Sequence, residues 1–223
     1  MPTIGITGGI STGKSTFCEC LREIVPEARF FDADQAVHQL VDRDPEVKKE
    51  LIAEFESAFF SREGDLNRAA LRAIIFSDPA KKSALEKILH PRIRRQWSAE
   101  AKPHRKSCDF FFADIPLLYE TGGEILCDRV VVVACSRSLR LERMLRRAPL
   151  EGRAPASPAA ASPELRPPVN ERIAMEMINA QMPLEEKISR ADHVVWNNGN
   201  CSVLKEQAKL LVDLWQKESW TKA

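Results

Sequence analysis

The sequence predicts an α/β fold in which helices cover a parallel β-sheet. Short apolar runs alternate along the chain with longer amphipathic stretches, which is the order of elements in such folds. The runs Phe110–Ala113 and Val130–Val133 are apolar without interruption, as expected for strands buried on both faces. The two observations together indicate a parallel sheet at the centre of the molecule.

Further strands are expected at the start, middle and end of the chain, over Thr3–Thr7, Arg29–Phe31 and His193–Trp196. The first is followed by a helix whose apolar face contains Phe17, Leu21 and Ile24. A final amphipathic helix is expected to begin at Ser202, with an apolar face of Leu204, Leu211, Leu214 and Trp215.

The stretch between the second and third strands has helical periodicity and no strong strand signal. A first helix is expected to bury Val47, Leu51, Ile52 and Phe55. A second, long helix is marked by Leu85, Ile88, Leu89, Ile93 and Trp97. Since this is too much chain for a simple crossover, we expect an inserted helical lobe over about residues 35–107 of a single domain that covers residues 1–223.

Composition excludes several classes of protein. Of the 223 residues, 44% are hydrophobic and 29% charged, which is unlike a disordered chain. The net charge of +1 gives no overall field to hold nucleic acid or an anionic membrane. No signal peptide or membrane span is apparent, so we expect a cytoplasmic location and no protein partner.

Two other features of the composition concern cysteine and proline. The six cysteines are scattered without metal-ligand spacing, which indicates reduced, mostly structural thiols. Six of the chain's 14 prolines fall between residues 148 and 169, so a mobile loop without a catalytic role is expected there.

The segment from Gly8 to Ser15 fits the pattern G-x-x-x-x-G-K-[ST] of a phosphate-binding P-loop. It follows an apolar strand and opens an amphipathic helix, which is the context that the motif requires. Glycines let backbone N–H groups turn toward a phosphate at the positive end of that helix. The nucleotide-binding residues are expected to be Gly9, Ile10, Ser11, Thr12, Gly13, Lys14, Ser15 and Thr16.

Within this motif, side chains have separate expected tasks. Lys14 would bridge the β- and γ-phosphates, Ser15 would place its hydroxyl on Mg²⁺, and Thr16 would hold the α-phosphate. Asp114 ends the third strand in the manner of a Walker B carboxylate and would hold the hydration shell of the Mg²⁺. A surface aspartate at the end of a strand is the alternative.

Asp32 and Asp34 follow the second strand, at the edge of the sheet where ligands of such folds bind. Either carboxylate could serve as the general base for an acceptor hydroxyl. The alternative is a helix N-cap at Asp34, because an apolar helical set follows it.

With these motifs assembled, the chain resembles the dephospho-CoA kinase family, whose members complete coenzyme A synthesis. The similarity covers about residues 3–214 and consists of six blocks in order: TGGISTGKST at 7–16, DAD at 32–34, LNRAALRAIIFSDPAKKSALEKILHPRIR at 66–94, DIPLLYE at 114–120, AQMPLEEK at 180–187 and ADHVVWNNG at 191–199. The HPR and PLLYE segments are more diagnostic of the family than the P-loop.

The resemblance implies a P-loop NTPase-type, three-layer α/β/α fold with a five-stranded parallel sheet. It also implies that the helical lobe binds the acceptor and that a lid, over about residues 140–182, closes on the triphosphate. The implied reaction is the Mg²⁺-dependent phosphorylation, by ATP, of the ribose 3′-hydroxyl of dephospho-CoA.

The resemblance also implies roles for individual residues. Asp34 would be the base, with Asp32 as the rival, and Arg92 would bind phosphates of the acceptor. His90 would belong to the same acceptor signature, or else serve as a structural histidine. The acceptor cleft would be lined by the segment Pro116, Leu117, Leu118, Tyr119 and Glu120, although the adjacent leucines could simply be core.

Three polar residues would complete the nucleotide side. Arg143 and Arg147, four residues apart on one helix face, would stabilise the migrating phosphoryl group, or else be solvated. Asn198 would lie near the adenine, where a polar turn residue would look the same. The chain departs from the family at Ser11, where a glycine is usual, at Ala148, and in its long Pro/Ala-rich insertion.

Other functions remain open on the sequence. Another small-acceptor P-loop kinase, of the nucleoside or nucleotide type, is the nearest alternative. A nucleotide-dependent switch or assembly ATPase is a more distant one, and the N-K-x-D motif expected of a GTP-specific switch is not present.

Overall fold

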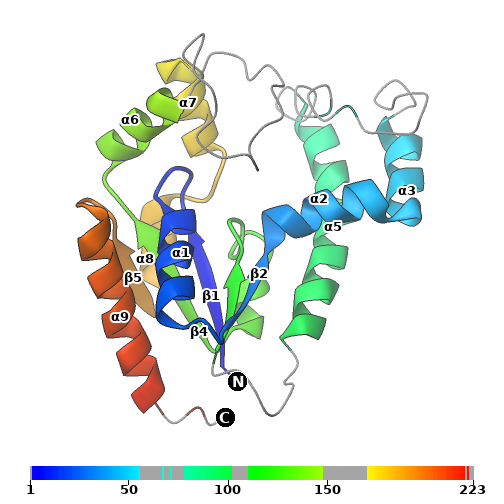
Figure 1. Cartoon of the computed structure of the whole chain (residues 1–223). Coiled ribbons are helices and arrows are strands. Elements are labelled where there is room, and N and C mark those ends of the chain that lie inside the picture. The colour runs from blue at the N-terminus through cyan, green and yellow to red at the C-terminus, as the bar shows by residue number, and fades with distance from the viewer. Residues whose placement is uncertain are drawn as a thin grey trace. The chain divides into compact units, whose positions relative to one another are not determined.

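The computed structural model describes residues 2–55, 67, 71, 78–101, 110–147, 170–218 and 220 (Figure 1). These residues form two compact units. Residues 32–55, 67, 71 and 78–100 form the helical unit, and the others form the sheet unit. The insertion at 148–169 lies outside the described residues, and the bounds 35–107 and 140–182 given above stay predictions.

The sheet unit contains five strands in the order β2-β3-β1-β4-β5. Their bounds are β1 Thr3–Gly8, β2 Arg29–Asp32, β3 Phe111–Asp114, β4 Arg129–Ala134 and β5 His193–Trp196. The pairs β1–β3, β1–β4 and β4–β5 are parallel, with Gly5 opposite both Ala113 and Val130. The predicted α/β class with a five-stranded parallel sheet is therefore confirmed.

Burial explains why the central strands have uninterrupted apolar sequences. Every residue of β1 and β3 is buried, as are the last five of β4. Side chains that alternate along these strands enter different layers. Ile4, Ile6 and Phe112 face a core that also contains Phe17 of one helix and Trp215 of another.

Helices α1 (Lys14–Ile24) and α9 (Cys201–Lys217) provide that core on one face of the sheet (Figure 1). On the other face, α8 (Leu184–Arg190) and the segment after β3, including the 3₁₀ helix η2 (Gly123–Leu126), cover β1 and β4. The three-layer arrangement places the loop after β1 at the carboxyl edge of the parallel strands.

Helices α6 (Arg137–Arg147) and α7 (Glu171–Asn179) form a smaller cluster in the sheet unit. Met144 of α6 packs with Ala174 and Ile178 of α7. Ile10, from the loop after β1, packs against the same cluster. The phosphate loop is therefore in apolar contact with the helix that carries Arg143.

The helical unit contains α2 (Ala33–Arg43), α3 (Pro45–Phe55) and α5 (Pro79–Glu100). Its core consists of Val41, Val47, Leu51, Phe55, Leu71 and Leu89. Two of its helices begin with the same sequence, Asp-Pro, in which proline suits the first helical position and aspartate caps the free N–H groups. Asp44 accepts from Glu46 N at 2.9 Å, and Asp78 accepts from Ala80 N at 2.8 Å.

Two residues expected on buried faces are exposed. Ile52 is 42% exposed although Leu51 is fully buried. The side chains by which α3 joins the core of the helical unit recur every four residues, at positions 47, 51 and 55, and position 52 is not among them. Leu214 is 44% exposed, while the neighbouring Trp215 is fully buried. The final helix begins at Cys201 rather than Ser202, since Asn200 caps it by accepting from Val203 N.

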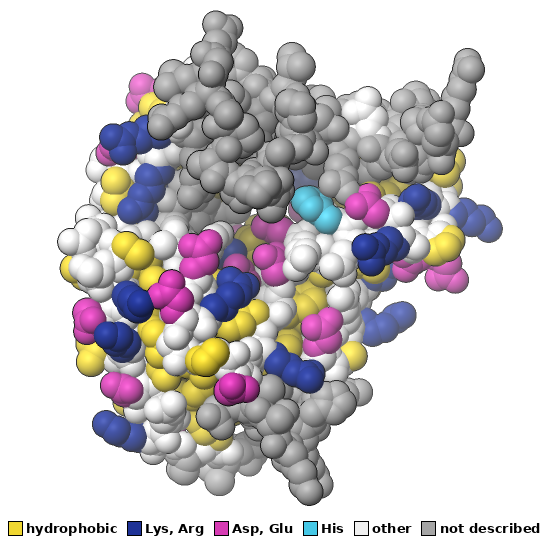
Figure 2. Space-filling model, in the orientation of Figure 1, with side chains coloured by type: hydrophobic (Ala, Val, Ile, Leu, Met, Phe, Trp, Pro, Cys, Tyr) yellow, Lys and Arg dark blue, Asp and Glu magenta, His cyan; other side chains and the backbone are white. Residues whose placement is uncertain are grey.

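The surface of the sheet unit has charges of both signs. On the face in Figure 2, Lys and Arg side chains are intermingled with Asp and Glu side chains. This agrees with the small net charge of the chain. Among the described helices, none is both long and apolar enough to cross a membrane.

We predict that Leu51→Ala lowers the free energy of unfolding by about 2–5 kcal/mol, because it leaves a cavity between α3 and its neighbours. The adjacent Ile52→Ala removes a side chain that is 42% exposed and is expected to cost about 0.5 kcal/mol or less. Urea denaturation followed by circular dichroism measures both. Equal losses would contradict the assignment of the buried face.

Candidate active site

The phosphate loop connects β1 to α1 and has left-handed backbone at two positions. Gly13, the residue before α1, has φ 93°, and Ser11 has φ 60°. Ser11, which stands where the family usually has a glycine, therefore has a torsion angle that glycine adopts more readily. The loop closes on itself through Thr12, whose buried hydroxyl donates to Gly9 O at 2.9 Å.

Two glycines of the loop have close contacts, and one of them, Gly13, also has a left-handed torsion angle. A Cβ on Gly13 would lie 2.0 Å from Nδ2 of Asn197, and one on Gly9 would lie 2.7 Å from Nη2 of Arg140. Real Cβ atoms essentially never approach other atoms so closely, so a side chain at either position would displace Asn197 or Arg140, or the loop itself. The consensus glycine at position 13 is thus a packing requirement of this chain as well as a conformational one.

Loop carbonyl groups accept hydrogen bonds from distant parts of the sheet unit. Asn197 Nδ2, just after β5, donates to Thr12 O at 2.8 Å, and Arg143 Nη1 donates to the same oxygen at 3.2 Å. Arg143 Nη2 also donates to Asn197 O at 3.0 Å, and Arg140 Nε to Ile10 O at 3.2 Å. Because these carbonyl groups are bonded to side chains, the N–H groups of the loop other than those of Ile10 and Thr12 are left for an anion.

The expected role of Arg143, contact with the migrating phosphoryl group, stays a prediction. In this structure its guanidinium supports the loop. The backbone of Arg147 belongs to α6, but its side chain lies outside the described residues.

Lys14, the first residue of α1, forms an ion pair with Asp114 at the end of β3. Both side chains are largely buried, at 14% and 7% exposure. The second oxygen of Asp114 accepts from Sγ of Cys18 at 3.4 Å. Burial raises the pKa of that thiol well above its usual range. The expected phosphate ligand and the expected metal-site carboxylate are therefore neighbours.

The residues present also fit a Mg²⁺ site of the P-loop type. Ser15 has an exposed hydroxyl in the first turn of α1, and Asp114 supplies a carboxylate, so the donors are hard oxygen atoms. No group of three or more His, Cys, Asp or Glu side chains with metal-binding geometry exists among the described residues. Such a site suits a metal that keeps waters and binds nucleotide phosphates.

Asn198 and Asn197 are neighbours with different environments. Asn198 is exposed, and its Oδ1 accepts from Ser136 N at 2.8 Å, which joins the ends of β5 and β4. Asn197 is buried against the phosphate loop. The role expected for Asn198 near an adenine remains a prediction, whereas the contact of Asn197 is structural and was missed.

The segment after β3 has a mixed character. Pro116 and Leu117 are half-buried, whereas Leu118 and Tyr119 are buried in the sheet unit. Leu118 therefore has the core position that we left open as its alternative. Tyr119 packs under the guanidinium of Arg190 at 4.4 Å, and burial raises the pKa of its hydroxyl to about 12.

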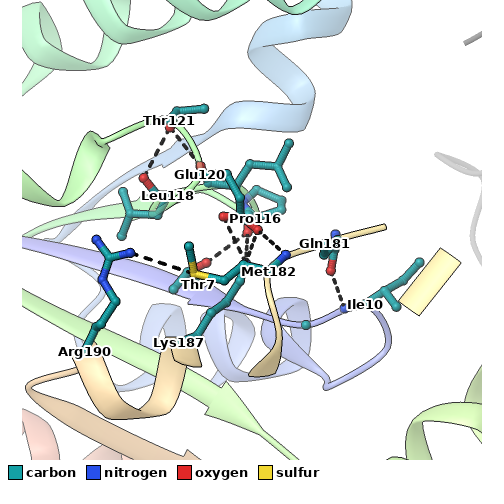
Figure 3. A network of polar contacts seen from close by, with 12 residues as sticks. Thr7, Ile10, Pro116, Leu118, Glu120, Thr121, Gln181, Met182, Lys187 and Arg190 are labelled. Atoms are coloured by element: carbon teal, nitrogen blue, oxygen red, sulfur yellow. Dashed lines mark hydrogen bonds and ion pairs between the residues drawn. The ribbon is translucent and has the colours of Figure 1, made fainter. Parts of the chain in front are cut away.

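A polar network joins this segment to the phosphate loop and to α8 (Figure 3). Lys187 is fully buried, lies 2.8 Å from Glu120, and donates to Pro116 O at 2.9 Å. Thr7 donates to the same carbonyl oxygen at 3.0 Å. Gln181 accepts from Ile10 N at 3.0 Å, so one N–H group of the loop is already occupied.

The helical unit contains the remaining predicted site residues. The N-cap of α2 is Asp32, which accepts from Gln35 N at 2.9 Å, rather than Asp34. Asp34 lies exposed in the first turn of α2. The N-cap alternative was thus placed on the wrong aspartate, because β2 ends one residue later than expected.

His90 and Arg92 lie two residues apart in α5. His90 is half-buried in mid-helix, and burial lowers its pKa. Arg92 donates to Ile88 O at 2.7 Å and to Glu50 of α3 at 2.7 Å. Its hydrogen-bonded ion pair with Glu50 raises the pKa of Arg92 still further, so this residue stays a cation.

Sequence reasoning missed four residues that hold the phosphate loop or the segment after β3: Arg140, Asn197, Gln181 and Lys187. Three of them fall within the blocks AQMPLEEK and ADHVVWNNG, in which we assigned no role to these positions. The available signal for Lys187 was its place three residues after Leu184, on the side of a short helix where apolar residues are expected.

The model of the dephospho-CoA kinase family matches residues 2–157. This range contains the phosphate loop, Asp114 and the helical unit. The chain belongs to the dephospho-CoA kinase family. Two curated members of the family illustrate the similarity: the protein of Anaeromyxobacter dehalogenans is 38% identical over 96% of this chain and 92% of its own length, and that of Bacillus cereus is 31% identical over 95% and 96%.

Solved structures agree with this assignment. The crystal structure of TT1252 from Thermus thermophilus has a TM-score of 0.73 and 30% identity, covering 98% of each chain. Dephospho-CoA kinase from Campylobacter jejuni has a TM-score of 0.62 and 23% identity, covering 96% of this chain and 97% of its own, and supports the fold alone. The dephospho-CoA kinase fold thus extends over nearly the whole chain.

Ser11 is the departure from the family pattern that the structure explains best. We predict that Ser11→Gly raises the free energy of unfolding by up to about 1 kcal/mol, because a left-handed torsion angle costs a residue with a Cβ about 1–2 kcal/mol and glycine offsets part of this by its greater freedom when unfolded. Chemical denaturation checks the sign.

A matched control is Ser202→Gly, in the first turn of α9, where glycine is expected to lower stability by about 0.5 kcal/mol. If both variants lost stability alike, strain at Ser11 would be refuted.

Proposed function

We propose that this kinase transfers the γ-phosphoryl group of ATP to the ribose 3′-hydroxyl of dephospho-CoA, giving coenzyme A and ADP. The observation that carries the proposal is the phosphate loop with Lys14 and Asp114 side by side, in a chain that belongs to the dephospho-CoA kinase family. This reaction completes coenzyme A synthesis. A cytoplasmic location, where both substrates occur, is part of the proposal.

On the nucleotide side, the phosphates bind at residues 9–16 and Asn198 lies near the adenine. Phosphoryl transfer needs mainly positioning and neutralisation of charge, and a P-loop places N–H groups and a lysine around the β- and γ-phosphates. Lys14 leaves its ion pair with Asp114, binds the γ-phosphate instead, and follows that group during transfer. Arg143 and Arg147 add positive charge to the same region.

Magnesium is proposed as the metal, held by the hydroxyl of Ser15 and, through water, by Asp114. When bound, it neutralises charge on the β- and γ-phosphate oxygens. If Lys14 turned to the phosphate, the carboxylate of Asp114 would be released from the ion pair and could help to hold the metal.

On the acceptor side, Asp34 is proposed as the base that takes the proton of the 3′-hydroxyl. The choice follows the place of Asp34 in the DAD block of the family, and Asp32, which caps α2 by accepting from Gln35 N, is the rival. Arg92 would bind acceptor phosphates, which would replace Glu50 as its partner. His90, two residues earlier in α5, is proposed to belong to the same acceptor signature. The segment of Pro116, Leu117, Leu118 and Tyr119 is proposed to line the acceptor side. Its half-buried residues, Pro116 and Leu117, would make the direct contacts.

The proposal is tested by measuring ADP formation with and without dephospho-CoA and by weighing the acceptor product. ADP formation is expected to require dephospho-CoA, which gains one phosphate, whereas nucleosides and nucleotides serve poorly. Lys14→Met is expected to lower kcat by about 10²–10³-fold, because a charge that stabilises the transition state is lost.

Lys209→Met is the control for that variant, since it breaks only a surface ion pair with Glu206 on α9. Two results would count against the proposal: ADP formation unaffected by dephospho-CoA, and equally rapid phosphorylation of nucleosides. The second would favour a nucleoside or nucleotide kinase.

A separate prediction distinguishes the two aspartates. Asp34→Asn is expected to slow single-turnover phosphoryl transfer by about 10²–10⁴-fold, because an amide cannot accept the proton. Asp32→Asn is expected to have little effect, because asparagine caps a helix as well as aspartate does. The opposite order of rates would make Asp32 the base.

A further inference from the structure

The 181–187 segment, which leads into α8, contacts both loops that carry the nucleotide site (Figure 3). At its start, Gln181 accepts from Ile10 N in the phosphate loop. At its end, Lys187 contacts Pro116 O and Glu120 in the segment after β3. One short stretch of chain therefore ties together two loops that are more than a hundred residues apart in sequence.

Pro116 O is the centre of this arrangement. It accepts from Lys187 Nζ at 2.9 Å and from Thr7 Oγ1 at 3.0 Å. Thr7 immediately precedes the P-loop motif, and Pro116 lies two residues after Asp114. The carbonyl thus joins the end of β1, which leads to Lys14, to the end of β3, which carries Asp114.

Because Lys187 is buried, its ammonium group depends on its hydrogen-bond and ion-pair partners. Its side chain is 0% exposed, and a buried ammonium group is retained only where it is paired and hydrogen-bonded. Glu120 provides the opposite charge, with oxygens 2.8 and 3.2 Å from Nζ. Glu120 also accepts from Met182 N at 3.1 Å, so the carboxylate is held by the same segment from two points.

The other charges near Lys187 belong to the nucleotide site. Its pKa is lowered first by burial and also by the positive charges of Arg140 and Lys14, while Glu120 raises it. The lysine therefore lies within electrostatic range of the loop cations. A lysine placed only to fill the core would have no reason to face them, since an apolar residue would fill the space without the desolvation cost.

We propose that Lys187 is a positioning residue that holds the segment after β3, through Pro116 O and Glu120, so that Asp114 keeps its place beside Lys14 for the metal–nucleotide complex. The inference rests on the proposed function only in taking Mg²⁺ with a nucleotide as the ligand. In this proposal Lys187 acts through Asp114 and itself contacts neither the nucleotide nor the metal.

The test measures binding of ADP by isothermal titration calorimetry, with Mg²⁺ and with EDTA, so that no acceptor and no turnover are needed. For Lys187→Met, the gain in ADP affinity that Mg²⁺ provides is expected to fall by about 10- to 100-fold, as when a residue supporting a metal ligand is lost. Affinity for ADP in EDTA is expected to change little.

Lys187→Met leaves Glu120 without its buried partner and can fail to fold for that reason. The double variant Lys187→Met/Glu120→Gln removes both charges, and the amide oxygen of the introduced glutamine can still accept from Met182 N. This double variant is therefore the one on which the proposal is judged. Lys187→Arg keeps the charge and the donors and is expected to recover most of the Mg²⁺-dependent affinity.

Lys205→Met is the matched control, because it breaks an exposed ion pair with Glu23, 2.5 Å long, elsewhere in the sheet unit. Its ADP binding is expected to equal that of the parent in both conditions. A folded double variant that keeps the full effect of Mg²⁺ would overturn the proposal, as would an equal loss of ADP affinity in Mg²⁺ and in EDTA. Neither result depends on whether dephospho-CoA is the acceptor.

Discussion

The phosphate loop can hold an anion only if its carbonyl groups are turned away and satisfied elsewhere. In this chain, Asn197 and Arg143 both donate to Thr12 O, and Arg140 donates to Ile10 O. These donors come from α6 and the end of β5, which are far from the loop in sequence. The close approach of Asn197 is possible only because Gly13 has no side chain. The rest of the nucleotide site depends on this arrangement.

A second constraint is the buried charge beneath the loop. Lys14 with Asp114, and Lys187 with Glu120, are two ion pairs with little exposure of their lysines. Buried pairs of this kind add little net stability compared with apolar side chains, but they are sensitive to the loss of either partner. Their value is therefore geometric: each oxygen and each ammonium has a defined position before a nucleotide arrives.

The start of α2 illustrates how a shift of one residue in the end of a strand changes a functional interpretation. Since β2 extends to Asp32, the first turn of α2 contains Asp34, and the cap is Asp32. The two carboxylates are two residues apart, but Asp32 is half-buried and caps the helix, whereas Asp34 is more exposed and lies in its first turn. A propensity argument cannot separate them, because strand ends shift by a residue or two with tertiary context.

Local sequence patterns were sufficient for the class of the fold, the phosphate loop and the family resemblance. Uninterrupted apolar strands and the GGISTGKS motif are visible in the sequence, and the helix faces followed from periodicity with small errors at Ile52 and Leu214. The resemblance rests on short blocks in a given order. The contacts that hold the phosphate loop and the segment after β3 could be found only in the folded chain: Arg143 contacts Thr12, Lys187 contacts Pro116, and Gln181 contacts Ile10, at separations of 131, 71 and 171 residues. No periodicity relates such positions, because the contacts arise where the carboxyl ends of parallel strands converge. Chain topology therefore brings these groups together, and a hydrogen bond of about 3 Å, not a sequence spacing, is what assigns each partner.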